Sequence, residues 1–535
     1  MRRAGPYPGA VNDQPHDERP ADVDPDLVDP LARPATGTSG GPDGERPRID
    51  PDDLATVLKV LGMMHELDAD DPDIQTVKRA TGRMYKSVRK ARRREAKQPI
   101  LDHDRAIIEK TATGSPKRID DETKGILLET QVEGTYAGEL EIARGCYICK
   151  KDYTLVDAFY HWLCPECAAT SHRKRVQHTD LRGKRALLTG GRAKIGMYIA
   201  LMLLRDGADL TITTRFPRDA ARRFTELADS PEWIDRLHIV GIDLRDPTQV
   251  VALADEVASK GPLDILINNA CQTVRRQPGS YTHLVDGEQA PLPTGVPLPE
   301  IMAFDRISDA HPAALMGAMG EHAAVDPVQA AQLASSAAAM TSLALSAGNA
   351  SLEKHLDGTA IDAGGLLPDI VDTNSWKATV DQVDPLEMLE VQLCNATAPF
   401  ILVSRLRPAM AAAVQAGARR AYVVNVSAME GQFSRRYKGS GHPHTNMAKA
   451  ALNMLTRTSS KEMFETDKIL MTAVDTGWIT DERPHHEKLR IAAEGWHAPL
   501  DLVDGAARVY DPIVRGEAGE DLYGHFLKDF EPSPW

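Results

Sequence analysis

A short apolar strand followed by a glycine-bearing turn and a helix constrains the fold of this chain more than any other stretch. The segment reads KRALLTGGRAKIG from Lys184 to Gly196, with the strand at Ala186 to Leu188 and the helix opening at Ile195. Such a turn points backbone N–H groups and the positive end of the helix at one place, which suits a phosphate group. The order of strand, glycine turn and helix predicts a dinucleotide-binding α/β unit.

Further motifs follow this turn in a fixed order. Asp243-Leu244 comes after a predicted strand at 238–242, and Asn268-Asn269-Ala270 comes after one at 264–267. Asn395 lies in NATAPF, and Lys449 lies in AKAAL. Together with the glycine turn, this series resembles the short-chain dehydrogenase/reductase (SDR) family from about Leu181 to Phe530. The resemblance implies a doubly wound, parallel-sheet Rossmann fold that binds NAD or NADP.

The resemblance also assigns residues to the cofactor. A basic residue after the second strand suits the 2′-phosphate of NADP, and Arg215 stands there, with Arg192 and Lys194 in the glycine turn. The sequence therefore favours NADP(H). Lys194 occupies the place of the family's middle glycine, and Cys271 occupies that of the last glycine of NNAG. The implied cofactor-binding residues are Thr189, Gly190, Arg192, Lys194, Ile195, Gly196, Arg215, Asp243, Leu244, Asn269, Ala270, Lys449 and Gly477.

The catalytic positions depart from the family pattern. Of the family's asparagine, serine, tyrosine and lysine, this chain keeps Asn395 and Lys449, because Ala428 stands at the serine position and Thr445 at the tyrosine position. A threonine hydroxyl is far less acidic than a phenol, whose pKa is about 10, so the usual acid/base group is missing. Tyr437 and His444, which precede the lysine, are candidate replacements. The alternative is that both are ordinary loop residues.

Two close cysteine pairs predict a metal site. Cys146-x-x-Cys149 and Cys164-x-x-Cys167 are separated by 14 residues. Two such knuckles complete a tetrahedral site of four thiolates, which suits structural Zn²⁺; the alternative is four free buried thiols. The sequence leaves open whether this zinc module docks against the Rossmann domain or offers a surface to a protein partner.

Composition divides the rest of the chain. Residues 1–49 are rich in Pro, Gly, Asp and Arg and are predicted to be disordered. Residues 50–140 form a helical segment with a basic helix at about Asp73 to Lys97, which is either a solvated face or a patch for an acidic partner or nucleic acid. The zinc knuckle occupies 141–178, and the SDR-like Rossmann domain occupies 181–535. An insertion at about 272–383 leaves the strands beside the cofactor cleft, so we expect a lid or pocket wall.

Charge and hydropathy restrict the partners and the location. The formal net charge is −14 over 535 residues, which argues against a general nucleic-acid binder. The N-terminal residues contain no apolar run, and the longest apolar stretch, Ile195 to Leu204, is too short to span a bilayer. We therefore expect a cytoplasmic protein without a membrane partner. The resemblance implies a homo-oligomer, a dimer or tetramer, formed through the helices that hold Asn395 and Lys449.

Two functions follow. The first is an NADP-dependent oxidoreductase with an altered acid/base group, which transfers hydride between the nicotinamide and a carbonyl or alcohol substrate. The second is a catalytically degenerate dinucleotide-binding sensor or scaffold that engages a partner through its zinc module. The complete set of cofactor motifs favours the first, whereas Ala428 and Thr445 favour the second.

Overall fold

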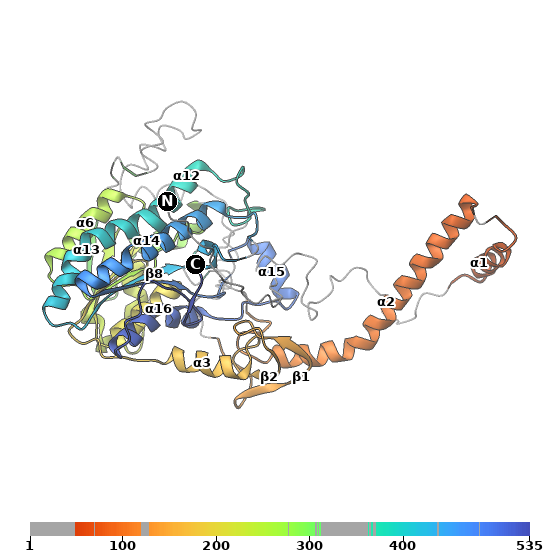
Figure 1. The fold of residues 1–535 in the computed structure, drawn as a ribbon, viewed down its shortest axis with the longest axis horizontal. Helices are drawn as coiled ribbons and strands as arrows, with labels where there is room; N and C mark the ends of the chain where they lie inside the picture. The colour runs from red at the N-terminus through yellow and green to blue at the C-terminus, as the bar shows by residue number, and fades with distance from the viewer. Residues whose placement is uncertain are drawn as a thin grey trace, which may run out of the picture.

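The computed structural model describes residues 49–118, 128–311 and 362–535, apart from 69, 277, 305–307, 309, 363–364, 367–370, 436–437 and 481. The predicted disordered tail, the Ala-rich middle of the insertion and Tyr437 therefore lie outside the described residues. The described chain forms an α/β domain, a small β module beneath it, and a helical arm that projects to one side (Figure 1).

A central sheet organises the α/β domain. In the described part of the chain its nine strands follow the order β11-β10-β9-β8-β6-β3-β4-β5-β7. All neighbours are parallel except β10 and β11. The strands are β3 (Arg185–Leu188), β4 (Asp209–Thr214), β5 (Leu237–Gly241), β6 (Ile265–Asn268), β7 (Glu300–Ala303), β8 (Ala421–Ser427), β9 (Ile469–Asp475), β10 (Phe526–Lys528) and β11 (Glu531–Ser533). The order reverses between β3 and β6, which is where doubly wound sheets bind ligands.

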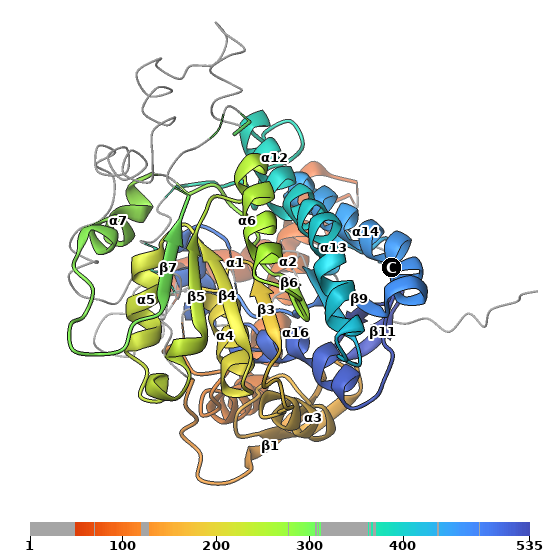
Figure 2. The same cartoon turned by 90° about the vertical axis from the view of Figure 1, so that its left-hand side faces the viewer.

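Helices cover both faces of this sheet (Figure 2). Apolar side chains of α4 (Lys194–Arg205), α5 (Pro217–Thr225) and α16 (Leu502–Glu517) form one core with the sheet. Those of α6 (Pro247–Ser259), α13 (Ala398–Gln415) and α14 (Pro443–Asp467) pack on the opposite face. Strands β6, β8 and β9 are buried along their whole length, as expected for the centre of a parallel sheet. The fold class is thus the predicted Rossmann-type α/β fold.

One long helix of the second face carries a local irregularity. Helix α12 (Pro385–Gln392) continues into α13 through a π-helical turn at Leu393–Thr397. The combined helix, Pro385–Gln415, is long and apolar enough to cross a membrane, but 56% of its most apolar window is buried inside the protein. It serves here as a core helix of the domain.

The described parts of the insertion differ from a simple lid. A 3₁₀ turn (Pro278–Tyr281) and α7 (Thr282–Gln289) pack beside α5, and β7 pairs with β5 and extends the sheet by one edge strand. The Glu288 carboxylate accepts the backbone N–H groups of Arg218 and Asp219 at the start of α5. At the far end of the insertion, the Trp376 ring stacks on His442, which directly precedes α14. The insertion therefore builds a sheet edge as well as part of the cleft wall.

The N-terminal region forms two helices and a hairpin module. Helix α1 spans Pro51–Met63, and α2 spans Pro72–Ile108. The predicted basic helix, which ended near Lys97, is shorter than α2. The helix continues to Ile108 because its last turns pack on the module, where the Asp104 carboxylate accepts the N–H groups of Glu141 and Ile142. The module contains β1 (Tyr136–Gly145), antiparallel β2 (Asp152–Asp157) and α3 (Pro165–Arg175). The predicted boundary at residue 141 consequently falls inside β1.

Candidate functional site: a dinucleotide cleft and a cysteine cluster

The glycine turn is held as a compact cradle at the carboxyl end of β3. The Thr189 hydroxyl oxygen accepts the backbone N–H groups of Asn269 and Ala270, each at 3.0 Å. The Asn269 side-chain amide in turn donates to the carbonyl oxygens of Thr189 and Gly190 at 3.1 Å. A Cβ atom on Gly196 would lie 2.0 Å from the Gly190 carbonyl oxygen, so only glycine fits there. The structure thus brings these predicted cofactor residues together.

Lys194 adopts the backbone conformation of the glycine that it replaces. Its φ of 53° is in the left-handed region, which costs a non-glycine residue about 1 to 2 kcal/mol. Its Nζ lies 3.5 Å from Asp362 Oδ2 and 3.6 Å from Glu482 Oε1. Burial opposes the ionisation of Glu482, but the charges of Lys194 and Arg276 lower the pKa of its carboxyl group to about 2. The mouth of the cradle therefore already contains carboxylates.

Arg215, directly after β4, lies beside two stacked aromatic rings. Its guanidinium carbon is 5.7 Å from the ring centre of Phe216 and 5.2 Å from that of Tyr281, and the two rings lie 6.1 Å apart and nearly parallel. Among the described residues, no carboxylate forms an ion pair with Arg215. Arg192, by contrast, pairs with Asp219 at 2.5 Å. Arg215 is therefore the cation of this region that is positioned for an added phosphate.

The predicted adenine contact has protein partners of its own. The Asp243 carboxylate pairs with Arg245 at 2.6 Å and lies 3.3 Å from His311 Nε2, and Arg245 also bridges to Glu390 at 2.8 Å. Burial opposes ionisation, yet the Arg245 charge holds the pKa of Asp243 well below its usual range. Leu244, beside it, is buried in the core. His311 and Tyr281 come from the insertion, where no sequence signal marked them.

The residues predicted for the nicotinamide end are held by backbone contacts. Asn395 is buried in the π-helical turn, where it exchanges two hydrogen bonds with the backbone of Gln272 at 2.8 and 2.9 Å. Such π turns recur at functional sites. The buried Lys449 ammonium donates to the Val426 carbonyl oxygen at 2.8 Å, at the end of β8. Gly477 has a φ of 78°, and its N–H donates to the Asp475 carboxylate at 3.2 Å, which shapes the turn after β9.

The acid/base positions hold no acidic hydroxyl. Ala428 follows β8, and the buried Thr445 hydroxyl has no hydrogen-bond partner among the described residues. Ser427 does not replace the serine function, because its hydroxyl donates to the Asn453 side chain at 2.6 Å.

His444 is a buried imidazole near this gap. Only 2% of it is exposed, and neither ring nitrogen has a hydrogen-bond partner among the described residues. Its Nε2 lies 3.9 Å from the Glu387 carboxylate, which accepts hydrogen bonds from Ser375 and from the Arg275 N–H group. Burial lowers the pKa of His444 and raises the pKa of Glu387. Glu387 is a candidate partner that sequence reasoning missed.

The four cysteines of the module form a cluster. The sulfur atoms of Cys146, Cys149, Cys164 and Cys167 all lie within 4.8 Å of one another. The sulfur atoms of Cys149 and Cys164 are 3.6 Å apart, and the Cys164 N–H donates to the Cys146 sulfur at 3.3 Å. Four converging thiol groups fit a tetrahedral metal site, and N–H donors to sulfur are typical of the shell around such a site.

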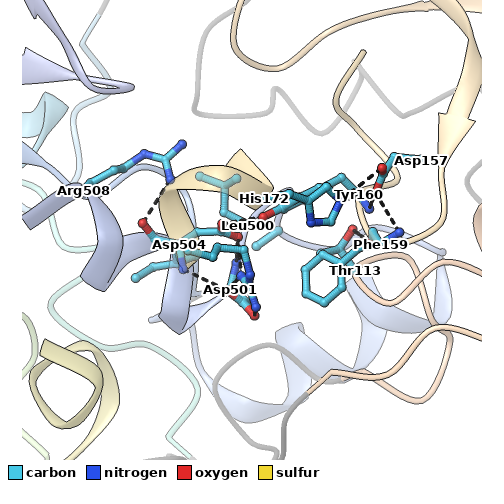
Figure 3. A network of polar contacts seen from close by, with 12 residues as sticks. Thr113, Asp157, Phe159, Tyr160, His172, Leu500, Asp501, Asp504 and Arg508 are labelled. Atoms are coloured by element: carbon cyan, nitrogen blue, oxygen red, sulfur yellow. Dashed lines mark hydrogen bonds and ion pairs between the residues drawn. The ribbon is translucent and has the colours of Figure 1, made fainter. Parts of the chain in front are cut away.

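A polar network fixes this module to the α/β domain (Figure 3). The Tyr160 hydroxyl donates to Asp504 at 2.6 Å, and Arg175 pairs with Asp501 at 2.5 Å. Asp501 and Asp504 form the capping box that opens α16. Arg118 reaches the carbonyl oxygens of Leu500 and Ala498 at 2.7 Å each. The Tyr147 hydroxyl accepts the backbone N–H of Trp478 in the turn after β9. The module therefore docks on the Rossmann domain beside the cofactor cleft.

Known proteins are similar in sequence to parts of this chain. Residues 184–286 match the family model described as short chain dehydrogenase. An uncharacterized protein of Acanthamoeba polyphaga mimivirus is 29% identical over 383 residues, which cover 69% of this chain and 71% of that protein. A probable oxidoreductase of Streptomyces lividans is 40% identical over 91 residues, which cover 17% of this chain and only 29% of the relative.

A solved structure of the same fold type is also similar. The NADPH-bound carbonyl reductase from chicken fatty liver is 19% identical, with a TM-score of 0.38, and the match covers 66% of this chain and all of that one. The two probable oxidoreductases that are 40% identical match this chain over less than a third of their own length. Residues 184–286 of the Rossmann-type domain are therefore similar to the short chain dehydrogenase family.

Proposed function

We propose that this protein is an NADP-dependent oxidoreductase of the SDR type with an altered acid/base group. The observation that carries the proposal is the position of Arg215, which lies beside the stacked rings of Phe216 and Tyr281 and pairs with no carboxylate among the described residues. It stands at the end of β4, next to the glycine cradle. A planar guanidinium in this place suits the 2′-phosphate that distinguishes NADP from NAD.

The residues of the cleft fit a dinucleotide. The cradle from Gly190 to Gly196 leaves no room for added side chains and presents the N-terminal end of α4 to a pyrophosphate. Thr189 and Asn269 hold its shape, and Lys449 of α14 donates from its ammonium group to the Val426 carbonyl oxygen of β8, on the expected nicotinamide side. When bound, the nicotinamide supplies or accepts the hydride, whereas the protein orients the partners and manages the proton.

Binding has a local electrostatic cost. Asp362 and Glu482 lie beside Lys194, so a pyrophosphate competes with two carboxylates for the same ammonium group. In this exchange a pyrophosphate would replace carboxylate at the Lys194 ammonium, and Glu482 belongs to the segment between β9 and α15 (His485–Ala493). We infer that cofactor binding and movement of this segment occur together.

The proton step falls to His444 in this proposal. In carbonyl reduction, hydride adds to the carbonyl carbon while a protonated group gives its proton to the oxygen; in alcohol oxidation both transfers reverse. His444 Nε2 lies 3.9 Å from the Glu387 carboxylate, and burial together with the nearby His442 lowers the pKa of His444. Asn395 and Lys449 keep their places and orient the site. Tyr437, outside the described residues, stays the second predicted proton donor.

A specific observation favours the alternative, a non-catalytic dinucleotide sensor. The Thr445 hydroxyl is buried without a partner among the described residues, and Ala428 supplies only a methyl group, so the usual substrate-activating pair is absent. The sequence hypothesis was that a sensor would bind its partner through the zinc module, and part of that module's surface is already covered. Tyr147, Tyr160 and Arg175 of the cysteine module contact the Rossmann domain, so this face of the module is not available to a partner.

We propose that the cysteine cluster holds one structural zinc ion. The support is chemical: four thiol groups converge, and a site with four protein ligands leaves no open position for a substrate. In this role the metal stabilises the hairpin of β1 and β2 together with α3. It thereby supports the network that anchors the start of α16.

We also propose a homo-oligomer formed through α13 and α14. These helices expose large apolar side chains: Phe400 is 57% exposed, Met447 58% and Met454 53%. Exposed apolar side chains gathered on neighbouring helices are typical of subunit interfaces. Light scattering of the wild type and of Phe400→Glu tests this, because the proposal predicts a smaller species for the variant and fails if both are monomers.

The function is tested in two steps on the full chain. Binding of NADPH and NADH is measured by intrinsic fluorescence, and hydride transfer is followed at the nicotinamide absorbance with a panel of aldehydes, ketones and alcohols. Tight NADPH binding with turnover supports the oxidoreductase. NADPH binding without turnover of any substrate class supports the sensor, and failure to bind either nucleotide contradicts both.

A further inference from the structure

We propose that the exposed basic face of α2 binds the phosphate backbone of double-stranded nucleic acid. The feature is the stretch from Lys78 to Lys97, which holds ten lysines and arginines and one acidic residue, Glu95. All ten cationic residues are exposed. This surface, called the basic arm below, lies outside the dinucleotide cleft, and its role goes beyond the proposed oxidoreductase activity.

The basic arm stands apart from the body of the protein. Helix α2 packs on the module through its last turns, where Ile107 and Ile108 are buried, and the stretch from Lys78 to Lys97 projects away from the body of the protein (Figure 1). Twenty helical residues extend over about 30 Å. The side chains of the arm can therefore contact a rod-shaped partner without bringing that partner against the α/β domain.

The cations are ordered on one side of the helix. At about 100° per residue, nine of the ten fall within an arc of about 160°, and Arg92 lies just outside it. The opposite side has a narrow seam of small or apolar residues, Thr81, Met84, Val88 and Ala91, which Glu95 interrupts. A one-sided row of cations is the arrangement that follows a line of phosphates, since duplex DNA has one negative charge per about 1.7 Å of its axis.

The net charge of the whole chain hides the positive charge of this helix, because the positive and negative residues lie in different parts of the molecule. The arm carries a formal charge of +9 within a chain of −14, so the remaining residues carry −23. The sequence expectation against a general nucleic-acid binder rested on the net charge of the whole chain, and it left this helix open as a local patch. In the structure the positive part is a separate projecting helix, so a local polyanion site and an acidic body coexist.

Two other binding partners fit the basic arm less well than nucleic acid does. A second copy paired through the seam would bring two +9 arms together, which repel each other at low ionic strength. An anionic membrane would favour a broad apolar face for insertion, whereas the seam of Thr81, Met84, Val88 and Ala91 is narrow. A flat anionic surface would also repel the acidic body. A helix about 10 to 12 Å across instead matches the major groove of DNA, about 12 Å wide.

The test uses the full chain without nicotinamide cofactor, so it is independent of the oxidoreductase proposal. Fluorescence anisotropy is measured with a labelled DNA duplex and an RNA duplex of about 30 base pairs, over about 50 to 200 mM salt. The arm variant combines Arg89→Gln, Lys90→Gln and Arg93→Gln. The matched control combines Lys260→Gln, Arg405→Gln and Lys461→Gln, three exposed cations on the α/β domain. Both variants lose three positive charges.

The wild type is expected to bind duplex, with affinity that falls steeply as salt rises. The arm variant should bind about tenfold or more weakly at low salt, and the slope of its salt dependence should drop by about 0.9 for each phosphate that the variant no longer neutralises. The body control should match the wild type. Preference for the DNA or the RNA duplex then identifies the source of the phosphates.

Three results would overturn the proposal. The first is no binding to either duplex at the lowest salt. The second is equal weakening by the arm and body variants. The third is arm-dependent binding to vesicles containing phosphatidylserine, with none to duplex, which would assign the arm to a membrane instead. Unchanged circular dichroism and melting temperature establish that the variants remain folded.

Discussion

The hydroxyl oxygen of Tyr147 accepts a hydrogen bond from the backbone N–H of Trp478 at 3.0 Å. Tyr147 lies between Cys146 and Cys149, whereas Trp478 follows Gly477 in the turn after β9. Burial raises the pKa of Tyr147, so the group remains a neutral phenol. This hydrogen bond joins the first cysteine knuckle to the turn after β9, which in the proposed function lies beside the nicotinamide.

Metal removal should therefore affect both parts of the molecule. Treatment with a zinc chelator is expected to lower the melting temperature by at least about 5 °C and to weaken NADPH binding, because the knuckle no longer holds the turn. Zinc added back should restore both, and elemental analysis should find one zinc ion per chain.

A matched variant separates the bond from the metal. Tyr147→Phe keeps all four thiol groups but removes the acceptor for the Trp478 N–H, so metal content should stay at one while NADPH affinity falls several-fold. Full NADPH affinity in the chelated protein would show that the module is not coupled to the cleft.

The carboxylates at Lys194 predict a gain of affinity on mutation. Glu482→Gln removes one of the two anions that compete with a pyrophosphate for the Lys194 ammonium, so NADPH should bind several-fold more tightly. Glu465→Gln, an exposed carboxylate on α14, is the control and should leave binding unchanged. Weaker binding by Glu482→Gln would mean that this residue supports the cofactor site rather than competing at it.

The buried imidazole predicts the pH dependence of catalysis. Burial lowers the pKa of His444 below its ordinary value of 6.5, so the proton needed for carbonyl reduction is lost at a lower pH than usual. The rate of reduction should be highest in acid and fall as pH rises through that lowered pKa. His444→Gln should remove this fall in rate with rising pH and reduce kcat about 100-fold. The control His486→Gln, at an exposed histidine, should leave both the pH profile and kcat unchanged. An unchanged profile in His444→Gln would assign the proton to another group.

A buried carboxylate predicts the pH dependence of stability. Burial and the nearby Asp529 raise the pKa of Asp475 to about 6, above its value in an unfolded chain. The native state then favours the protonated form, so ionisation above pH 6 costs up to about 3 kcal/mol that is absent below pH 4. Asp475→Asn should raise the melting temperature at pH 8 and have little effect at pH 4. The reverse pattern would contradict the assignment.

Much of the α/β core is readable from the sequence. The predicted strands at 238–242 and 264–267 agree to within one residue with β5 (Leu237–Gly241) and β6 (Ile265–Asn268), because both contain short aliphatic runs that are buried inside the parallel sheet. The motif residues Thr189 and Asn269 meet because they follow neighbouring strands of one parallel sheet. The clustering of the four cysteines followed from their spacing.

Other features arise from contacts that leave no periodic signal. Glu482, Asp362 and His311 reach the cleft from loops, and their partners lie far away in the sequence. Strand β7 is a four-residue edge strand within a Pro- and Gly-rich stretch, so neither its length nor its composition marks it. The extension of α2 past Pro99 depends on packing against β1, which overrides the local preference to end the helix.

The central claim, that the cleft binds NADP through Arg215, is tested most directly by calorimetric titration of the full chain with NADPH and NADH. We predict that NADPH binds more tightly than NADH and that Arg215→Ala weakens NADPH binding about 10- to 100-fold while changing NADH binding little. Arg218→Ala, an exposed neighbour, should behave as the wild type. Equal affinities for the two nucleotides, or equal losses in both arginine variants, would contradict the account.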